Sequence, residues 1–103
     1  MIFADSHAPP VVVVLSGDLD LYEAPRVRDA LDALDGPGVV DMSAVRLVDS
    51  SVLNELARVA KRAGPQRVTL IVKSPNIRKG LDIVQFERLF QIVADPTAEA
   101  AAE

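Results

Sequence analysis

Three adjacent polar side chains, Asp49-Ser50-Ser51, are the residues of this sequence best placed to do chemistry. They stand directly before a helical pattern that begins near Ser51. Short oxygen-bearing side chains at such a point accept hydrogen bonds from the free N–H groups of the first helical turn. The same end of a helix favours negative charge, because the helix dipole is positive there. The triplet is therefore either a plain helix cap or the site of a hydroxyl that carries a phosphate.

A second acidic group follows the first predicted strand. The continuous β-branched run Val11 to Leu15 is typical of a strand buried on both faces, and Gly17-Asp18-Leu19-Asp20 ends it. Taken alone, Asp18 and Asp20 are typical turn or cap residues. The helix that follows has two candidate starts: a capping box from Asp20 to Glu23, or Pro25 at the first helical position.

The rest of the chain continues the alternation of strands and helices. Further strands are predicted at 39–42, 68–72 and 89–93, and residues 43–48 are predicted as a connection. Helices are predicted up to about Asp35, from about Ser51 to Ala63 before Gly64-Pro65, and from Ser74-Pro75 with a buried stripe of Ile77, Leu81 and Val84. Ile2-Phe3 is a candidate edge strand, and residues 96–103 read as a tail. This order predicts one α/β domain with helices packed on a parallel or mixed sheet.

Composition excludes several classes of function. The chain has 103 residues, half of them apolar, a formal charge of −4 and no cysteine. There is no basic run, so we expect no nucleic-acid partner. The longest purely apolar run, Val11 to Leu15, is far shorter than the roughly 20 residues of a membrane span, so we expect a soluble protein without membrane insertion, in the cytoplasm.

Catalysis by the chain itself is not expected. A hydrolytic serine needs a base close by, and the single histidine, His7, has no evident orienting partner. No spacing of ligands suggests a metal site, and no cofactor is predicted. We expect a protein that is not an enzyme.

Several short motifs in order resemble the STAS domain family, in particular the anti-sigma factor antagonists of bacteria. They extend over roughly residues 9–95 and cover nearly the whole domain 1–103. The motifs are Gly17-Asp18-Leu19-Asp20, Ala24-Pro25, Asp41-Met42-Ser43, Val48-Asp49-Ser50-Ser51, Ser74-Pro75-Asn76-Ile77-Arg78 and Leu89-Phe90-Gln91-Ile92.

The resemblance implies a mixed sheet of four or five strands with helices mainly on one face. It implies that Ser50 is phosphorylated by an anti-sigma factor with serine kinase activity, which the unphosphorylated chain binds, and that a serine phosphatase resets the switch. Asp20, Asp49, Ser50 and Ser51 are the implied partner-binding residues. A homodimer is left open.

The chain departs from the family pattern beside the expected phosphoacceptor. Family members usually have Gly where this chain has Val52, and a helix-ending Gly is common where it has Gln85. A β-branched residue is stiff, so Val52 is expected to narrow the approach to Ser50. This departure keeps an alternative open: an accessory or scaffold STAS subunit that binds a transporter or another regulatory protein without phosphorylation.

Overall fold

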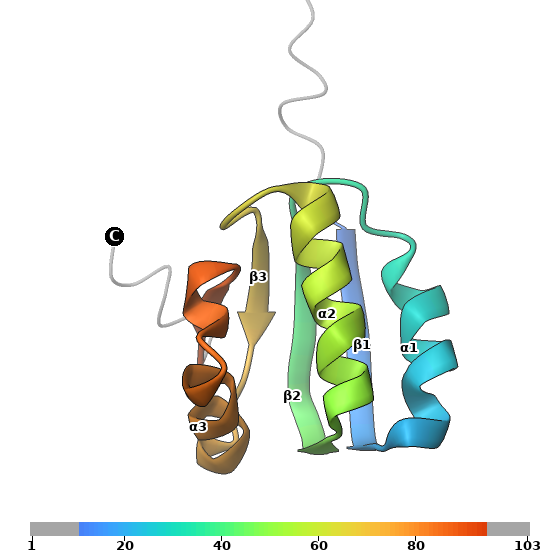
Figure 1. Cartoon of the computed structure of the whole chain (residues 1–103), viewed down its shortest axis with the longest axis vertical. Helices are drawn as coiled ribbons and strands as arrows, with labels where there is room; N and C mark the ends of the chain where they lie inside the picture. The colour runs from blue at the N-terminus through green and yellow to red at the C-terminus, as the bar shows by residue number, and fades with distance from the viewer. Residues whose placement is uncertain (1–10, 95–103) are drawn as a thin grey trace, which may run out of the picture.

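The computed structural model describes residues 11–94 as one layer of strands covered by one layer of helices (Figure 1). The elements in order are β1 (Val11–Leu19), the 3₁₀ turn η2 (Leu21–Glu23), α1 (Ala24–Leu31), β2 (Gly38–Val48), α2 (Ser50–Ala63), β3 (Val68–Ile71), α3 (Pro75–Ile83), the 3₁₀ turn η3 (Phe86–Arg88) and β4 (Gln91–Val93). The predicted α/β class is confirmed.

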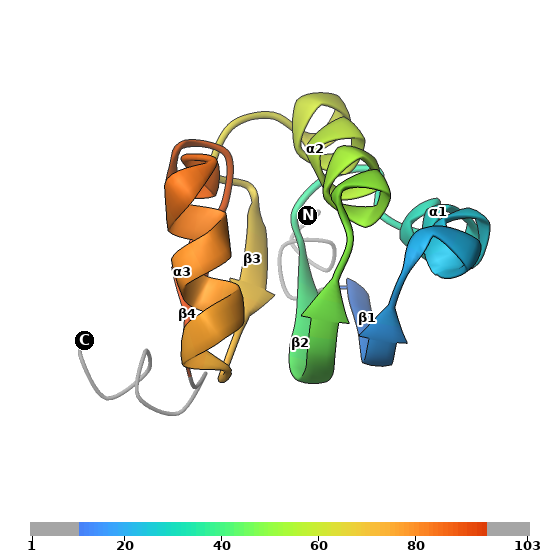
Figure 2. The ribbon, with the colours of Figure 1, turned by 60° about the horizontal axis from the view of Figure 1, so that its bottom comes forward.

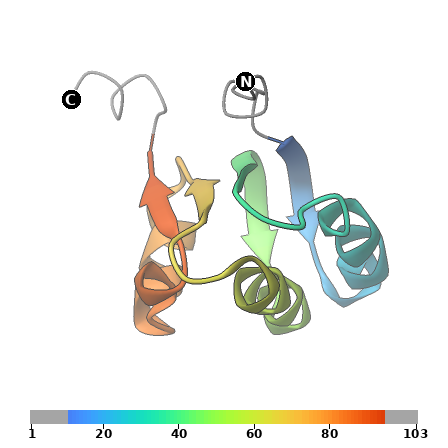
Figure 3. The same ribbon diagram turned by 90° about the horizontal axis from the view of Figure 1, so that it is seen from above.

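The sheet has the strand order β1-β2-β3-β4, and each neighbouring pair is parallel. Figures 2 and 3 show α1, α2 and α3 on the same face of the sheet. Parallel neighbours require crossover connections, and in this chain helices supply them. All pairs of described strands are parallel, whereas the resemblance implied a mixed sheet; the candidate edge strand at Ile2-Phe3 lies outside the described residues.

The prediction that β1 is buried on both faces is wrong. Val13 and Leu15 face the helices and are buried, whereas Val12 and Val14 are 54% and 67% exposed. The reason is that the described helices cover only one face of the sheet. Four consecutive valines look the same in the sequence whether one face or both are covered.

The prediction that residues 43–48 form a connection is also wrong. β2 continues through them to Val48, because β1 continues through its own expected turn to Leu19 and the two strands stay paired. Register shifts between Val14 and Ser16 and between Gly17 and Asp18 accommodate the extra length. Gly17 adopts a φ of 81° at this irregularity, a conformation that glycine reaches without steric cost.

The predicted helices are present, with changes at their ends. Both candidate starts of the first helix are used, because Asp20 caps η2 and Pro25 lies in the first turn of α1. α2 begins one residue before the expected Ser51 and ends at Ala63, as predicted. α3 ends at Ile83, and Val84 is 47% exposed. The prediction that Val84 belongs to the buried stripe of this helix is therefore wrong.

The core lies between the sheet and the helices and is almost entirely aliphatic. Its fully buried side chains include Leu31, Leu34, Met42, Leu56, Leu70 and Leu81, with Phe86 and Phe90 stacked at a tilt of 40° beside α3. Gly38 is required at the start of β2, because a Cβ there would lie 2.9 Å from the carbonyl oxygen of Val11. None of the described helices is long and apolar enough to cross a membrane.

Candidate functional site

The Asp20 and Asp49 motifs meet at one edge of the sheet. β1 and β2 are parallel, so their carboxyl ends lie side by side, with η2 following one and α2 the other (Figure 1). The backbone N–H of Asp49 donates to the carbonyl oxygen of Leu19 at 2.9 Å, which joins the two loops directly. η2 also contacts α2. Residues separated by about thirty positions in the chain therefore form one surface.

Asp49 is the N-cap of α2, and its carboxylate is held by Ser51. Its Oδ2 accepts from the backbone N–H of Ser51 at 2.9 Å and from the Ser51 hydroxyl at 2.6 Å. These hydrogen bonds, the hydroxyl one foremost, lower the pKa of Asp49 below its ordinary value of 3.8. The carboxylate therefore stays ionised at neutral pH, and Ser51 serves the helix cap.

Ser50 differs from both of its neighbours. It is the first residue of α2 and is exposed. Its hydroxyl forms no hydrogen bond with any side chain or backbone group of residues 11–94. A helix N-terminus accommodates added negative charge. The Ser50 oxygen is thus accessible to a phosphoryl donor, and a phosphate there would be compatible with the helix.

Asp20 is also exposed, but its carboxylate caps η2. Oδ1 accepts from the backbone N–H groups of Tyr22 at 3.0 Å and Glu23 at 3.2 Å. Asp18, one position before Leu19, pairs with Arg46 of β2 at 3.3 Å. The two hydrogen bonds to Asp20 fix the turn after β1, and the carboxylates of Asp18, Asp20 and Asp49 lie at the same edge of the sheet.

Val52 does not narrow the approach to Ser50, contrary to expectation. Its side chain is fully buried and belongs to the core cluster under α2. It therefore points toward the sheet, whereas Ser50 faces solvent. The departure from the usual glycine adds apolar packing on the inner side of α2 and adds no obstruction on the outer side.

Sequence reasoning missed an apolar patch beside the site. Leu21, Tyr22 and Leu47 are 60%, 86% and 50% exposed. Leu21 and Tyr22 form η2 with Glu23, and Leu47 lies opposite Asp18 in the pairing of β1 with β2. The sequence signal for these exposed residues was Leu21-Tyr22, directly after the cap residue Asp20. These two large apolar side chains do not belong to the buried stripe of the following helix. Exposed aromatic side chains such as that of Tyr22 are enriched at protein interfaces.

Among residues 11–94 there is no group of three His, Cys, Asp or Glu side chains that could hold a metal ion. The sole histidine, His7, lies outside this range, so the expectation about it is not addressed. In a comparison with protein families, residues 2–94 match the model described as "Mlab, STAS domain". The chain belongs to the STAS-domain family.

Comparisons with curated proteins and with solved structures gave no significant match. The family match covers the sheet, the helices and both loops of the site, in agreement with the resemblance carried by the sequence motifs. STAS domains are generally binding domains without catalytic activity.

Proposed function

We propose that this STAS domain is an anti-sigma factor antagonist switched by phosphorylation at Ser50. The unphosphorylated form binds an anti-sigma factor that is also a serine kinase. Transfer of a phosphoryl group to the Ser50 oxygen releases that partner, and a serine phosphatase restores binding. The observation that carries the proposal is the exposed Ser50 hydroxyl, which no group of the described chain engages.

The two serines of the motif have different roles in this proposal. Ser51 supports the cap through its bond to Asp49, so modification there would break a contact that holds the helix start. Ser50 holds no such contact, so modification there leaves the fold intact. A switch of this kind acts through the surface and requires no refolding.

Electrostatics supplies the releasing force. A phosphate at Ser50 adds about −1.5 to −2 charges at pH 7 beside the ionised Asp49. Asp20 and Asp18 lie at the same edge of the sheet. Like charges brought together across an interface cost several kcal/mol, and about 1.4 kcal/mol changes affinity tenfold. One phosphate that meets an acidic group of the partner is therefore enough to weaken binding strongly.

The apolar patch of Leu21, Tyr22 and Leu47 supplies the attraction. A large exposed aromatic side chain surrounded by polar groups is a frequent hot spot of protein interfaces. The patch and Ser50 are parts of one surface, so charge added at Ser50 acts on contacts made by the patch.

The test measures the affinity of the kinase partner for the unmodified chain and for the chain phosphorylated stoichiometrically at Ser50. We expect at least about a hundredfold loss of affinity on phosphorylation, as for two steps of 1.4 kcal/mol. Ser50→Ala should bind like the unmodified chain and resist release by ATP. Tyr22→Ala should weaken binding without altering the fold. Equal affinity of both forms would leave an accessory STAS subunit that binds without phosphorylation as the better description.

A further inference from the structure

Several features that cost stability lie together at the end of α3. Ile83 and Val84 are large and apolar, yet they are 72% and 47% exposed. Gly80 interrupts the helix interior, where glycine costs about 1 kcal/mol relative to alanine. Gln85 adopts a left-handed φ of 62°, and its side chain makes no capping hydrogen bond. Local features that the fold itself does not need, gathered at one place, indicate a functional surface.

Gly80 leaves bare backbone on an exposed side of α3. A Cβ added at Gly80 would meet no atom within 4 Å, so no contact of the described chain requires glycine there. Ile83 and Val84 follow it by three and four residues and therefore lie on the same side of the helix. Helical side chains lean toward the N-terminal end, so these two flank the bare backbone. The arrangement lets another backbone or a large side chain approach closely between two apolar groups.

Lys79 adds a cation to this side of the helix. The other charged residues of α3, Arg78 and Asp82, pair with each other at 3.0 Å. Lys79 is exposed and forms no ion pair within residues 11–94. It precedes Ile83 by four residues, so its side chain borders the apolar pair. The charge of Lys79 is therefore available to a carboxylate from another molecule.

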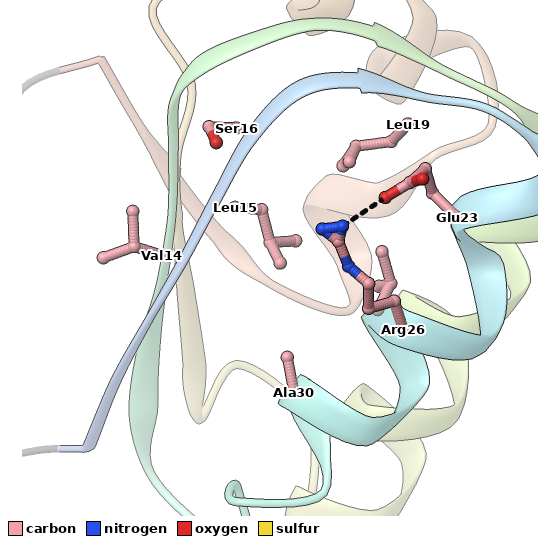
Figure 4. A pocket seen from close by; sticks show the side chains of 8 residues that line it. Val14, Leu15, Ser16, Leu19, Glu23, Arg26 and Ala30 are labelled. Atoms are coloured by element: carbon pink, nitrogen blue, oxygen red, sulfur yellow. Dashed lines mark ion pairs between the residues drawn. The ribbon is translucent and has the colours of Figure 1, made fainter.

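The pocket between β1 and α1 does not offer the same combination. Figure 4 shows Arg26 and Glu23 at this pocket, joined by an ion pair of 3.2 Å. Its charged groups are thus already matched within the chain, whereas Lys79 is not. The face of α3 has both exposed apolar side chains and an unmatched charge.

The two ends of the chain fit this face less well than a partner does. Residues 95–103 contain no Val, Leu, Ile, Met or aromatic residue, so they can bury little of Ile83 and Val84. Residues 1–10 precede β1, and β1 and α3 lie at opposite ends of the layers, with α2 between them (Figures 1 and 2). A protein with larger apolar side chains is the better match.

We propose that the face of α3 formed by Lys79, Gly80, Ile83 and Val84 docks an amphipathic helix of a partner protein. A large apolar side chain of that helix packs over the bare backbone of Gly80, between Ile83 and Val84. A neighbouring carboxylate of the same helix binds Lys79. Helices that dock in this way present apolar anchors one helical turn apart.

This docking face is separate from the proposed switch. Ser50 follows the carboxyl end of β2. α3 connects the parallel strands β3 and β4, so it runs back toward their amino ends and places Ile83 there. The two sites are thus at opposite ends of the helical layer, and a partner docked on α3 stays bound whether or not Ser50 carries a phosphate.

The test uses the full chain and a fluorescein-labelled peptide made of two copies of Glu-Leu-Leu-Glu-Ala-Leu-Glu. Fluorescence anisotropy measures affinity, and methyl chemical shifts locate the peptide. We expect binding with shifts at Ile83 and Val84. Ile83→Ser and Lys79→Glu should each weaken binding at least about tenfold. The matched control Arg26→Glu, an exposed charge reversal on α1, should have no effect.

Gly80→Gln separates docking from folding. Glutamine has room at this position and favours a helix more than glycine does, so thermal unfolding of the free variant should shift upward. Its side chain covers the bare backbone, so peptide affinity should fall at least about tenfold. Ser50→Asp should bind the peptide like the natural chain, which distinguishes this site from the switch.

A second peptide, with lysine in place of every glutamate, tests the charge. It should bind at least about tenfold more weakly than the acidic peptide. Absence of binding to the natural chain, unchanged affinity of Gly80→Gln, or equal affinity for the two peptides would overturn the proposal. In the free chain, nuclear Overhauser contacts from the methyl groups of Ile83 or Val84 to residues 1–10 or 95–103 would assign this face to the chain itself and would also overturn it.

Discussion

The backbone N–H of Asp49 lies 2.9 Å from the carbonyl oxygen of Leu19, and this bond joins the start of α2 to the end of β1. It places the loop that carries Ser50 against the loop that carries Asp20. Two motifs that are separate in the sequence thus become one surface. The arrangement depends on parallel pairing of β1 with β2 to their last residues.

Loss of the Ser51 hydroxyl should destabilise the fold, whereas loss of the Ser50 hydroxyl should not. Ser51→Ala removes the 2.6 Å bond to Asp49 and is expected to lower the free energy of unfolding by about 1 kcal/mol. Ser50→Ala removes no intramolecular bond and should change stability by less than about 0.5 kcal/mol. Urea denaturation of both variants checks this, and equal stability losses would contradict the assigned roles.

Protonation of two carboxylates, Asp41 and Asp49, should lower the stability of the fold at acidic pH. Hydrogen bonds from the hydroxyl and backbone N–H of Ser43 lower the pKa of Asp41, and those from Ser51 lower the pKa of Asp49, each from an ordinary value of 3.8. A lowered folded-state pKa contributes stability that is fully present above 3.8 and is lost as pH falls through the folded value. Carboxyl NMR titration should show the pKa of Asp41 rising toward 3.8 in Ser43→Ala; an unchanged pKa would refute the cause.

Gln85→Gly should stabilise the protein. Gln85 follows α3 with a φ of 62°, a left-handed conformation that costs a non-glycine residue about 1 kcal/mol. Glycine adopts it freely, so thermal unfolding should shift upward. Gln66 has the same φ, but its Nε2 donates to the carbonyl oxygen of Glu87 at 2.7 Å. Gln66→Gly therefore serves as the matched variant and should gain less or lose stability.

Arg62→Ala should be more destabilising than other arginine substitutions on α2. The Arg62 guanidinium donates to the carbonyl oxygens of Leu31 and Leu34 at distances of 2.7 to 3.2 Å, so it caps the end of α1. Its loss leaves the Leu34 carbonyl without these donors, whereas the Leu31 carbonyl still accepts from the backbone N–H of Leu34, and the cost is about 1–3 kcal/mol. Arg58→Ala is the control, because Arg58 makes only a 3.5 Å contact with Glu55. Similar chemical denaturation midpoints for the two variants would argue against the capping role.

The sequence identified the family, the α/β class and the cap at Asp49 because these depend on local patterns. It did not show that only one face of β1 is covered, because four consecutive valines are compatible with cover on one face or two. The end of α3 at Ile83 depends on the left-handed conformation of Gln85, which propensity does not favour. The Leu21, Tyr22 and Leu47 patch arises only when β1 and β2 bring their ends together.

Mass mapping of phosphate on the chain recovered from its native host tests the central claim most directly. The account predicts one phosphate on Ser50, none on Ser51, and none on a Ser50→Ala chain expressed in the same cells. Fragment spectra distinguish the two adjacent serines. A chain whose Ser50 stays unmodified across growth and stress conditions would contradict the phosphorylation switch and leave Asp49-Ser50-Ser51 as a helix cap within a binding surface.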